Sequence, residues 1–316
     1  MRQVSPEMGG LIRVSLNEQR RIAAKLDTTL AAVDACRQRL DGVAAILKRF
    51  RQAVLAAATS GELTREWREE RGEAAEWEKT TFGAACEDIT VGFVGKMADQ
   101  YVTVGVPFLR SLNVRPFYFD PASLAYISES FHASISKSTL RPGDLAIVRT
   151  GAPGQCCVIP ESLHEANCSD LVIARPGSRL AADYGAIVIN STLGQGFVKS
   201  EQVGVAQSHF NVGSMKRAPL QLPSIPEQQE IVRRTQALFT LADQLEARLS
   251  TARKVVDRLT PALLAKAFRG ELVPQDPNDE PASVLLERIR AARQAEAGAG
   301  KPSRRGRPKV SADSEN

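Results

Sequence analysis

The chain contains an internal repeat, in which residues 15–64 align with residues 224–273 over fifty positions without a gap. Fifteen of the fifty pairs are identical, and both copies begin with a Ser-x-x-Glu-Gln pattern and end near a Gly-Glu-Leu sequence. A duplication of this length limits the fold more than any local propensity does. The chain must therefore be built around two copies of one element.

Each copy has the apolar spacing of a long helix. Apolar residues recur at alternating steps of three and four, which is the a/d pattern of a supercoiled helix. In chain order they are Val33, Cys36, Leu40, Val43, Leu47, Phe50 and Val54, and then Ala242, Leu245, Leu249, Ala252, Val256, Leu259 and Leu263. Each helix would run about 40 residues, or roughly 60 Å at 1.5 Å per residue. Two coiled-coil helices are expected, although helices in an ordinary bundle core share this spacing.

The ends of both helices are marked by capping residues. Ser15–Glu18 and Ser224–Glu227 match the capping box, in which the two side chains satisfy backbone N–H groups of the first turn. Gly61 and Gly270 suit the left-handed residue that closes a helix. These signals predict helices that begin and end at equivalent positions in the two copies.

Composition excludes several classes of protein. No run approaches the roughly 18–20 apolar residues of a transmembrane helix, and the N-terminus lacks the pattern of a signal peptide. The five cysteines form no CxxC pair, so a secreted disulfide framework is not expected. Cys157, His164 and Cys168 have irregular spacing for a metal site, and reduced, partly buried thiols are the better interpretation. A cytoplasmic location is predicted.

The net charge of +5 is concentrated at one end of the chain. Residues 77–222 carry 12 basic and 12 acidic side chains, whereas residues 301–310 carry five basic groups and no acidic one. Bulk charge therefore does not by itself identify the middle of the chain as a nucleic-acid-binding domain.

Between the repeats the pattern changes to short β-branched and aromatic runs bounded by Gly, Pro, Asn and Asp, which is typical of strands. The expected strands are residues 89–94, 101–109, 117–119, 145–150, 156–160, 171–176 and 185–190. The last of these is ambiguous, because a short helix could begin near Asp183. Arg-Pro-Gly-Asp at 141–144 is a turn that leads into the strand at 145–150. The segment is expected to form a compact mixed domain.

Four stretches of this middle segment carry a specific resemblance. They are PFLRSLNV (107–114), RPGDLAIVRTGAPGQCCVIP (141–160), ANCSDLVIARP (166–176) and VGVAQSHFNVGSMKRAPLQLPSIPEQQEI (203–231). Together they resemble a target-recognition domain of the specificity (S) subunits of type I restriction–modification systems. The flanking repeats resemble the conserved spacer regions of that family, and the resemblance extends over roughly residues 11–275.

The resemblance implies an α+β fold, with one mixed α/β target-recognition domain and a long antiparallel two-helix coiled-coil spacer. The expected shape is a globular head on an antiparallel stalk. In the family two domains alternate with two spacer helices, so this chain resembles a truncated or half-length form with one domain. The expected parts are an N-terminal stub at 1–14, spacer helices at 15–64 and 224–273, the domain at 76–222, and a short helix with a basic disordered tail at 274–316.

The family's role implies a function in which this chain selects the DNA sequence and other subunits supply the chemistry. The expected partners are double-stranded DNA, methyltransferase (M) subunits docked on the exposed faces of the spacer helices, and restriction (R) subunits held through the M subunits. S-adenosylmethionine, ATP and Mg²⁺ would be bound by those partners, and no cofactor by this chain. A membrane partner is not expected.

Sequence readout requires side chains that hydrogen-bond base edges, together with contacts to phosphates. The candidates in loop-like settings are Arg110, Ser111, Asn113, Arg149, Thr150, Gln195, Lys199, Gln207, His209 and Asn211. Gln195 and Lys199 are expected in a Gly-rich loop where the backbone can approach a phosphate. Each of these residues alone is more often a solvated loop side chain, but as a group on such a domain some are expected to touch DNA.

The C-terminal tail contains Arg305-Gly306-Arg307-Pro308, which resembles an AT-hook core. Two guanidinium groups on an extended backbone can lie in a narrow A·T minor groove. A solvated basic tail that makes nonspecific phosphate contacts explains the same residues equally well.

Signs of catalysis are lacking in the sequence. It contains no GxxxxGK[ST] phosphate loop and no GxGxxG cofactor turn, and its three histidines suggest no triad. The leading hypothesis is therefore a non-catalytic DNA-specificity subunit. Three alternatives stay open: a half-subunit that pairs with a second copy of itself, a truncated fragment that only docks partner subunits, and an enzyme whose nuclease site is not visible.

Overall fold

The computed structural model describes residues 15–73, 76–201 and 210–298, without the side chains of residues 296–298. Contacts divide the chain into two compact units, one of residues 1–43 and 248–316 and one of residues 44–247. The helices are α1 (Leu16–Ser60), η2 (Glu62–Thr64), α2 (Arg65–Arg71), α3 (Phe82–Ala85), η3 (Ser111–Asn113), α4 (Glu129–Ser134), η4 (Ser136–Ser138), α5 (Ala182–Asn190), α6 (Thr192–Ser200), α7 (Val212–Arg217), α8 (Ile225–Phe268) and α9 (Ala282–Gly298), where η marks a 3₁₀ helix. The strands are β1 (Glu78–Thr81), β2 (Cys86–Val91), β3 (Tyr101–Val102), β4 (Val106–Leu109), β5 (Val114–Arg115), β6 (Tyr118–Phe119), β7 (Ala125–Ile127), β8 (Thr139–Leu140), β9 (Leu145–Val148), β10 (Cys156–Val158), β11 (Ala166–Cys168), β12 (Leu171–Pro176) and β13 (Pro219–Leu222).

Both repeat copies form the long helices that the sequence predicts, α1 with 45 residues and α8 with 44. Within the unit of residues 1–43 and 248–316, Arg37 pairs with Asp257 at 3.4 Å and Asp41 pairs with Arg253 at 2.7 Å. A later residue of α1 thus pairs with an earlier residue of α8, so these parts of the two helices run antiparallel.

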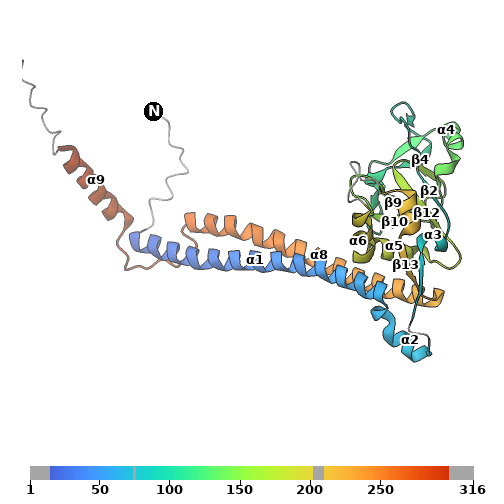
Figure 1. Ribbon diagram of the computed structural model, residues 1–316. Helices are drawn as coiled ribbons and strands as arrows, with labels where there is room; N and C mark the ends of the chain where they lie inside the picture. Colours follow the sequence, from blue (N-terminus) through green and yellow to red (C-terminus); the bar gives the residue numbers. More distant parts are fainter. Residues whose placement is uncertain (1–14, 74–75, 202–209, 299–316) are drawn as a thin grey trace, which may run out of the picture. The chain divides into compact units, whose positions relative to one another are not determined.

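The unit of residues 44–247 contains the other halves of the same two helices, and these are also antiparallel (Figure 1). Arg51 of α1 contacts Asp243 at 2.6 Å and Glu246 at 3.1 Å. Further along, Arg234 of α8 donates to the carbonyl oxygen of Leu63 at 2.9 Å. At this end, α1 precedes and α8 follows the sheet-containing domain in the sequence.

The predicted a/d seam is only partly correct. Val33, Leu47, Val54, Ala242 and Leu249 are buried, whereas four other members are exposed: Cys36, Val43, Leu245 and Leu259. Two helices can cover only a narrow stripe of each other, so a full heptad pattern leaves apolar side chains in solvent. The heptad pattern therefore contains more apolar residues than these two helices bury against each other.

The helix ends follow the capping prediction in part. Gly61 and Gly270 have φ of 83° and 71°, the left-handed values expected of them. Ser15 Oγ accepts the Glu18 N–H at 3.0 Å, as in a capping box. The Ser224 prediction is wrong for its side chain, since that hydroxyl donates to Glu73 at 3.3 Å instead.

The domain between the spacer helices contains two principal sheets. One has the strand order β10-β9-β12-β2, and the other has the order β3-β7-β4-β11-β8. Among the described residues, the strand pairs of these two sheets are antiparallel except β4 with β11, which are parallel. A separate β1–β13 ladder joins the two ends of the domain, pairing Glu78 with Leu222 and Thr81 with Pro219. The chain thus enters and leaves the domain at one place.

Several predicted strands are confirmed, and others need correction. β12 covers the predicted residues 171–176, and the Arg141–Asp144 turn closes with a 3.0 Å bond from the Asp144 N–H to the Arg141 carbonyl. Residues 185–190 belong to helix α5, not to a strand. Six consecutive residues of α5, 184–189, are buried, and a helix apolar on all sides has the same sequence pattern as a buried strand.

The start of α8 is anchored by a buried carboxylate. Glu227 accepts hydrogen bonds from the Thr64 hydroxyl at 2.7 Å and from Trp77 Nε1 at 3.0 Å, and it forms an ion pair with Arg68. Arg68 also donates to the Gly61 carbonyl at 2.8 Å. These contacts connect the segment that follows α1 to the first turn of α8. They also give both charged groups of the Arg68–Glu227 pair hydrogen-bond partners.

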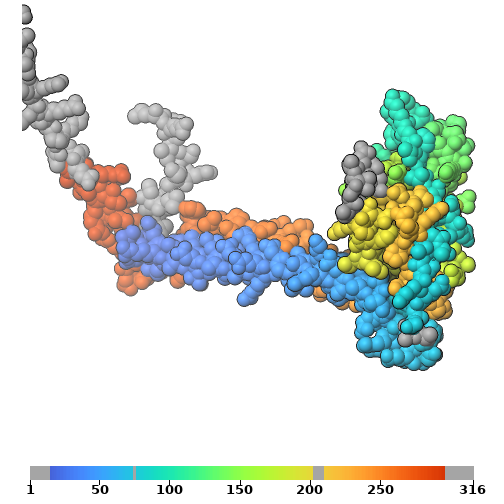
Figure 2. Space-filling view, viewed as in Figure 1, coloured from blue at the N-terminus to red at the C-terminus, as the bar shows by residue number. Residues whose placement is uncertain are grey.

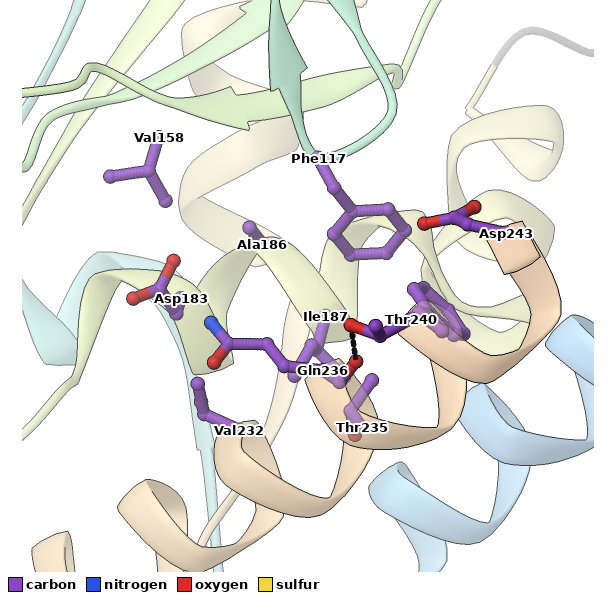
Figure 3. A pocket seen from close by; sticks show the side chains of 11 residues that line it. Phe117, Val158, Asp183, Ala186, Ile187, Val232, Thr235, Gln236, Thr240 and Asp243 are labelled. Atoms are coloured by element: carbon purple, nitrogen blue, oxygen red, sulfur yellow. Dashed lines mark hydrogen bonds between the residues drawn. The ribbon is translucent and has the colours of Figure 1, made fainter. Parts of the chain in front are cut away.

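The domain also packs on the next turns of α8, where a cavity of about 260 Å³ remains. Figure 3 shows Phe117 above this cavity, with Thr235, Gln236 and Thr240 of α8 below it. The Phe117 ring meets the Phe239 ring edge-to-face, with centroids 5.5 Å apart. Phe117 has φ of 66°, an uncommon backbone for an aromatic residue, so the turn is held in place by what it contacts.

Replacement of Arg68 by Ala should strongly destabilise the chain, because it leaves Glu227 buried without its charge partner. We expect the free energy of unfolding to fall by about 3–5 kcal/mol in chemical denaturation. Arg65→Ala is the matched control, since Arg65 lies one turn away on α2 with its side chain 59% exposed. That change should cost less than about 1 kcal/mol. Equal losses for the two variants would show that the buried pair contributes little.

Candidate nucleic-acid interface

Three strand ends meet at one edge of the domain. β4 and β11 run parallel with Leu109 opposite Cys168, so the residues that follow both strands emerge together. β9 pairs antiparallel with β12, with Val148 opposite Leu171, so the end of β9 meets the start of β12. Because β11 and β12 are separated by only two residues, all three ends share one place. The predicted site residues 110–111 and 149–150 are thereby brought together.

Asp170 lies at the centre of this edge, in the link between β11 and β12. Its carboxylate accepts a hydrogen bond from the Thr150 hydroxyl, and the Ser111 hydroxyl donates to it at 3.4 Å. The Arg149 N–H donates to the Asp170 carbonyl at 3.4 Å. Asp170 has φ of 57°, a left-handed conformation that Asp tolerates better than most residues. The two hydroxyl-bearing candidates are therefore positioned by a residue that the sequence analysis did not select.

Two arginines, Arg110 and Arg149, directly precede the two hydroxyl-bearing residues that bind Asp170. Arg110 donates from Nη2 to the Ser123 carbonyl at 2.7 Å, and its guanidinium lies 5.8 Å from the centre of the Tyr101 ring. The Nε atoms of Arg110 and Arg149 are buried and have no hydrogen-bond partner within the described part of the chain. A buried donor without a partner is costly, so each of these two Nε atoms needs a structural or functional explanation.

Asn113 has a different role from its neighbours. It is fully buried, and its side-chain amide donates to the carbonyls of Asp120 and Ala122 at 3.0 and 3.2 Å. Its Oδ1 accepts the Arg110 N–H at 3.0 Å. Since both ends of this side chain bind backbone, Asn113 shapes the turn after β4 and presents no free group to a base edge.

Gln195 and Lys199 lie on helix α6, so the predicted Gly-rich loop is wrong. Ser191 caps the helix by accepting the Gly194 N–H at 3.2 Å. A Cβ at Gly194 would lie 2.4 Å from the Ile189 carbonyl oxygen, so this glycine allows close packing rather than a loop. Gln195 donates to the Gly154 and Ile189 carbonyls, whereas Lys199 is exposed. The α6 surface is visible in Figure 2 as part of the domain's outer face.

The remaining candidates are structural or lie outside the described residues. Asn211 caps α7 by accepting the Ser214 N–H at 2.9 Å. Gln207, His209, Arg305 and Arg307 fall in segments that the structure does not describe, and their contacts with DNA stay predictions.

Asp170 was the residue that sequence reasoning missed. Its signal is local: an Asp after Asn-Cys-Ser and directly before a strongly apolar strand, where a turn residue with positive φ is common. What the sequence does not contain is the pairing of β4 with β11 and of β9 with β12, and that pairing supplies the neighbours.

Metal and membrane sites find no support in the described part of the chain. No group of three or more His, Cys, Asp or Glu side chains there is placed to hold a metal ion. Cys157 and Cys168 are both buried, and burial raises the pKa of the Cys157 thiol to about 12. Among the described helices, none is long and apolar enough to cross a membrane.

Comparison with known proteins identifies the family. No protein-family model matches the chain. The specificity subunit of the type I restriction enzyme StySPI of Salmonella potsdam is 32% identical over 321 residues, which cover 96% of this chain and 68% of that protein. This chain belongs to the family of type I restriction enzyme specificity subunits. The resemblance identified from the sequence is thereby confirmed.

Two Escherichia coli members are similar to the same extent. The EcoBI specificity subunit is 34% identical, with 90% of this chain and 64% of that protein covered, and the EcoKI subunit is 33% identical with the same coverage. The chain therefore spans 64% of the length of these two relatives.

Solved structures of the family support the fold. A chain from a structure of a type I restriction–modification system matches with a TM-score of 0.62 at 21% identity, over 81% of this chain and 60% of that one. The HsdS subunit from Thermoanaerobacter tengcongensis matches with a TM-score of 0.51 at 21% identity, over 81% and 59%. The predicted fold class, a mixed α/β domain with two long spacer helices, is confirmed.

Replacement of Asn113 by Ala should lower stability, because it removes three hydrogen bonds from a buried side chain to backbone groups. We expect a loss of about 1–3 kcal/mol in the free energy of unfolding. Leu112→Ala in the same 3₁₀ turn is the control, since Leu112 is exposed and its truncation should cost about 0.5 kcal/mol or less. An Asn113 variant as stable as the wild type would contradict the structural role.

Proposed function

We propose that this chain is the DNA-specificity subunit of a type I restriction–modification complex. The observation that carries the proposal is the edge at which Ser111, Arg149 and Thr150 contact Asp170. Arg110 precedes Ser111 directly at this edge. Family membership supports a role in DNA specificity, and the strand-end edge contains the residues proposed to contact DNA. The enzyme names of the relatives refer to whole complexes, so the catalytic steps are assigned to partner subunits.

The charge pattern of the edge favours contact with bases over contact with phosphates alone. Arg donors suit guanine O6 and N7, hydroxyls suit several base edges, and a carboxylate accepts from cytosine N4. A carboxylate among the arginines repels phosphate oxygens, so a simple phosphate clamp would not contain Asp170. Exposed Lys199 on α6 is the proposed phosphate contact, since a lone ammonium positions the backbone without reading sequence.

We assign the docking of M subunits to apolar side chains that the spacer helices leave exposed. In the unit of residues 44–247 these are Ile46, Leu241 and Leu245, and in the other unit they are Val43, Val255, Leu259, Leu264 and Phe268. Exposed apolar residues on helices are suited to packing against partner helices. R subunits would then associate through the M subunits. S-adenosylmethionine, ATP and Mg²⁺ would be bound by those partners, in the cytoplasm.

A second copy of this chain is the proposed source of a second reading head. The described residues contain one recognition domain, and a two-fold dimer would present two identical heads to a symmetric split site. A monomer mass in light scattering, both with and without DNA, would exclude this arrangement.

Selection from a randomised duplex library, with the chain and its cognate methyltransferase subunit, tests the function. A split motif with mirror-related halves is expected if two copies act together, and a single short half-site if one head acts alone. Absence of any enrichment would contradict sequence reading and favour a fragment that only docks its partners. Cleavage of DNA by the purified chain with Mg²⁺ would instead indicate an enzyme.

Replacement of both Arg110 and Arg149 by Ala should weaken DNA binding and relax sequence preference. Each lost base contact should cost about 1–3 kcal/mol for the selected site and much less for unrelated DNA. Fluorescence anisotropy on the selected duplex and on a scrambled duplex, over a range of salt concentrations, measures both effects. Arg179→Ala is the control, because Arg179 pairs with Glu78 away from the edge and is exposed. Loss of affinity that is equal on both duplexes would assign the two arginines to phosphates.

A further inference from the structure

A fourth strand ends at the edge that contains Asp170. In the strand order β10-β9-β12-β2, β2 pairs antiparallel with β12 on the side away from β9, with Val91 opposite Val172 (Figure 1). The end of β2 therefore lies beside the start of β12. Phe93, two residues after β2, forms a parallel bridge with Ser169, which directly precedes Asp170. The segment that follows β2 thus emerges at the same strand-end edge as the proposed DNA contacts.

The turn at residues 93–95 is held in place by its own contacts. The Phe93 N–H donates to the Cys168 carbonyl at 2.7 Å. The Phe93 ring meets the Phe131 ring edge-to-face, with centroids 5.4 Å apart. A Cβ at Gly95 would lie 2.5 Å from Phe93 Cζ, so the backbone can fold this closely over the ring only because residue 95 is a glycine. Phe93 is therefore anchored on the domain.

Val94 lies between these two positions and has 71% of its surface exposed. The backbone on both sides of it is fixed, and a β-branched side chain has little freedom at χ1. Single exposed apolar residues are common on protein surfaces, but this one stands beside the residues that are proposed to contact bases. Val94 therefore adds a rigid apolar group to an edge whose other proposed DNA contacts are polar.

We propose that Val94 recognises thymine through its C5-methyl group in the major groove of DNA. Among the groups that base pairs display in that groove, the methyl group of thymine is the apolar one, and contact with it distinguishes an A·T pair from a G·C pair. The side chains that insert between base steps as wedges are mostly longer or flat, such as Phe, Leu and Met, so a short valine suits the methyl contact better.

This inference rests on the proposed DNA-specificity function and adds to it one residue and one base. The arginines and hydroxyls of the edge would read hydrogen-bonding groups, and Val94 would read a group that forms no hydrogen bond. The selected half-site should therefore contain a thymine whose methyl group contributes to affinity.

Replacement of each thymine in the selected duplex by deoxyuridine, one at a time, tests the contact, because it removes a methyl group and leaves the hydrogen-bonding groups in place. Fluorescence anisotropy with the full-length chain and its cognate methyltransferase subunit should show about 4-fold weaker binding at one of these positions, as expected for one buried methyl group. Val94→Ala should bind the unmodified duplex about 4-fold or more weakly. At the critical position, deoxyuridine should weaken its binding no further.

Val104→Ala is the matched control, because Val104 is 85% exposed and precedes β4, whereas the edge lies after the end of β4. This variant should keep both the wild-type affinity and the loss caused by deoxyuridine. The proposal would be overturned, with DNA specificity intact, by a selected site without thymine, by wild-type binding that no deoxyuridine weakens, or by a Val94→Ala variant that responds to deoxyuridine as the wild type does. Absence of any selected sequence would instead overturn the proposed function together with this inference.

Discussion

The domain between α1 and α8 is fixed to the helices through two adjacent side chains at the start of α8. Glu227 binds Arg68, Thr64 and Trp77, and it thereby holds the segment that leaves α1. Gln228 accepts the Ala181 N–H at 2.8 Å and donates to the carbonyls of Arg179 and Pro223. Because a buried charge and a buried amide must both be satisfied, any movement of the domain relative to these first turns breaks several bonds together.

This attachment matters for the proposed DNA contacts at the strand-end edge, because residues that bind a specific sequence must be held in a fixed orientation. From the Arg179–Ala181 loop the chain continues into α5, whose buried face packs beneath the sheet that contains β9, β10 and β12. The same sheet places Arg149 and Asp170 through its backbone register. The side chains at the edge are thus connected to α8 by a short path of packed and hydrogen-bonded elements. Positioning of this kind would lower the entropic cost of the proposed binding to DNA.

The sequence predicted the parts of the fold that depend on local signals. The repeat, the helical spacing and the left-handed glycines at 61 and 270 follow from periodicity and backbone preference alone. The errors arose where tertiary packing outweighs local preference. The Gly-rich segment around Gln195 and Lys199 was predicted to be a loop, but it is helix α6, in which Gly194 allows close approach to the Ile189 carbonyl. Cys36 fits the a/d pattern but is exposed, because two helices cover only a narrow stripe of each other. Asp170 was missed because its importance comes from strand pairing between distant segments.

The two repeat copies show how a duplicated element changes when its surroundings differ. A Ser-x-x-Glu-Gln sequence begins both helices, yet the Ser15 hydroxyl both caps its helix and donates to Asp279, whereas Ser224 donates to Glu73. The glutamate of the second copy is satisfied within the chain, and the one in the first copy lacks a donor for its buried Oε1 among the described residues. The same Ser-x-x-Glu-Gln sequence therefore makes different contacts in the two copies, because the residues that surround the two helix starts differ.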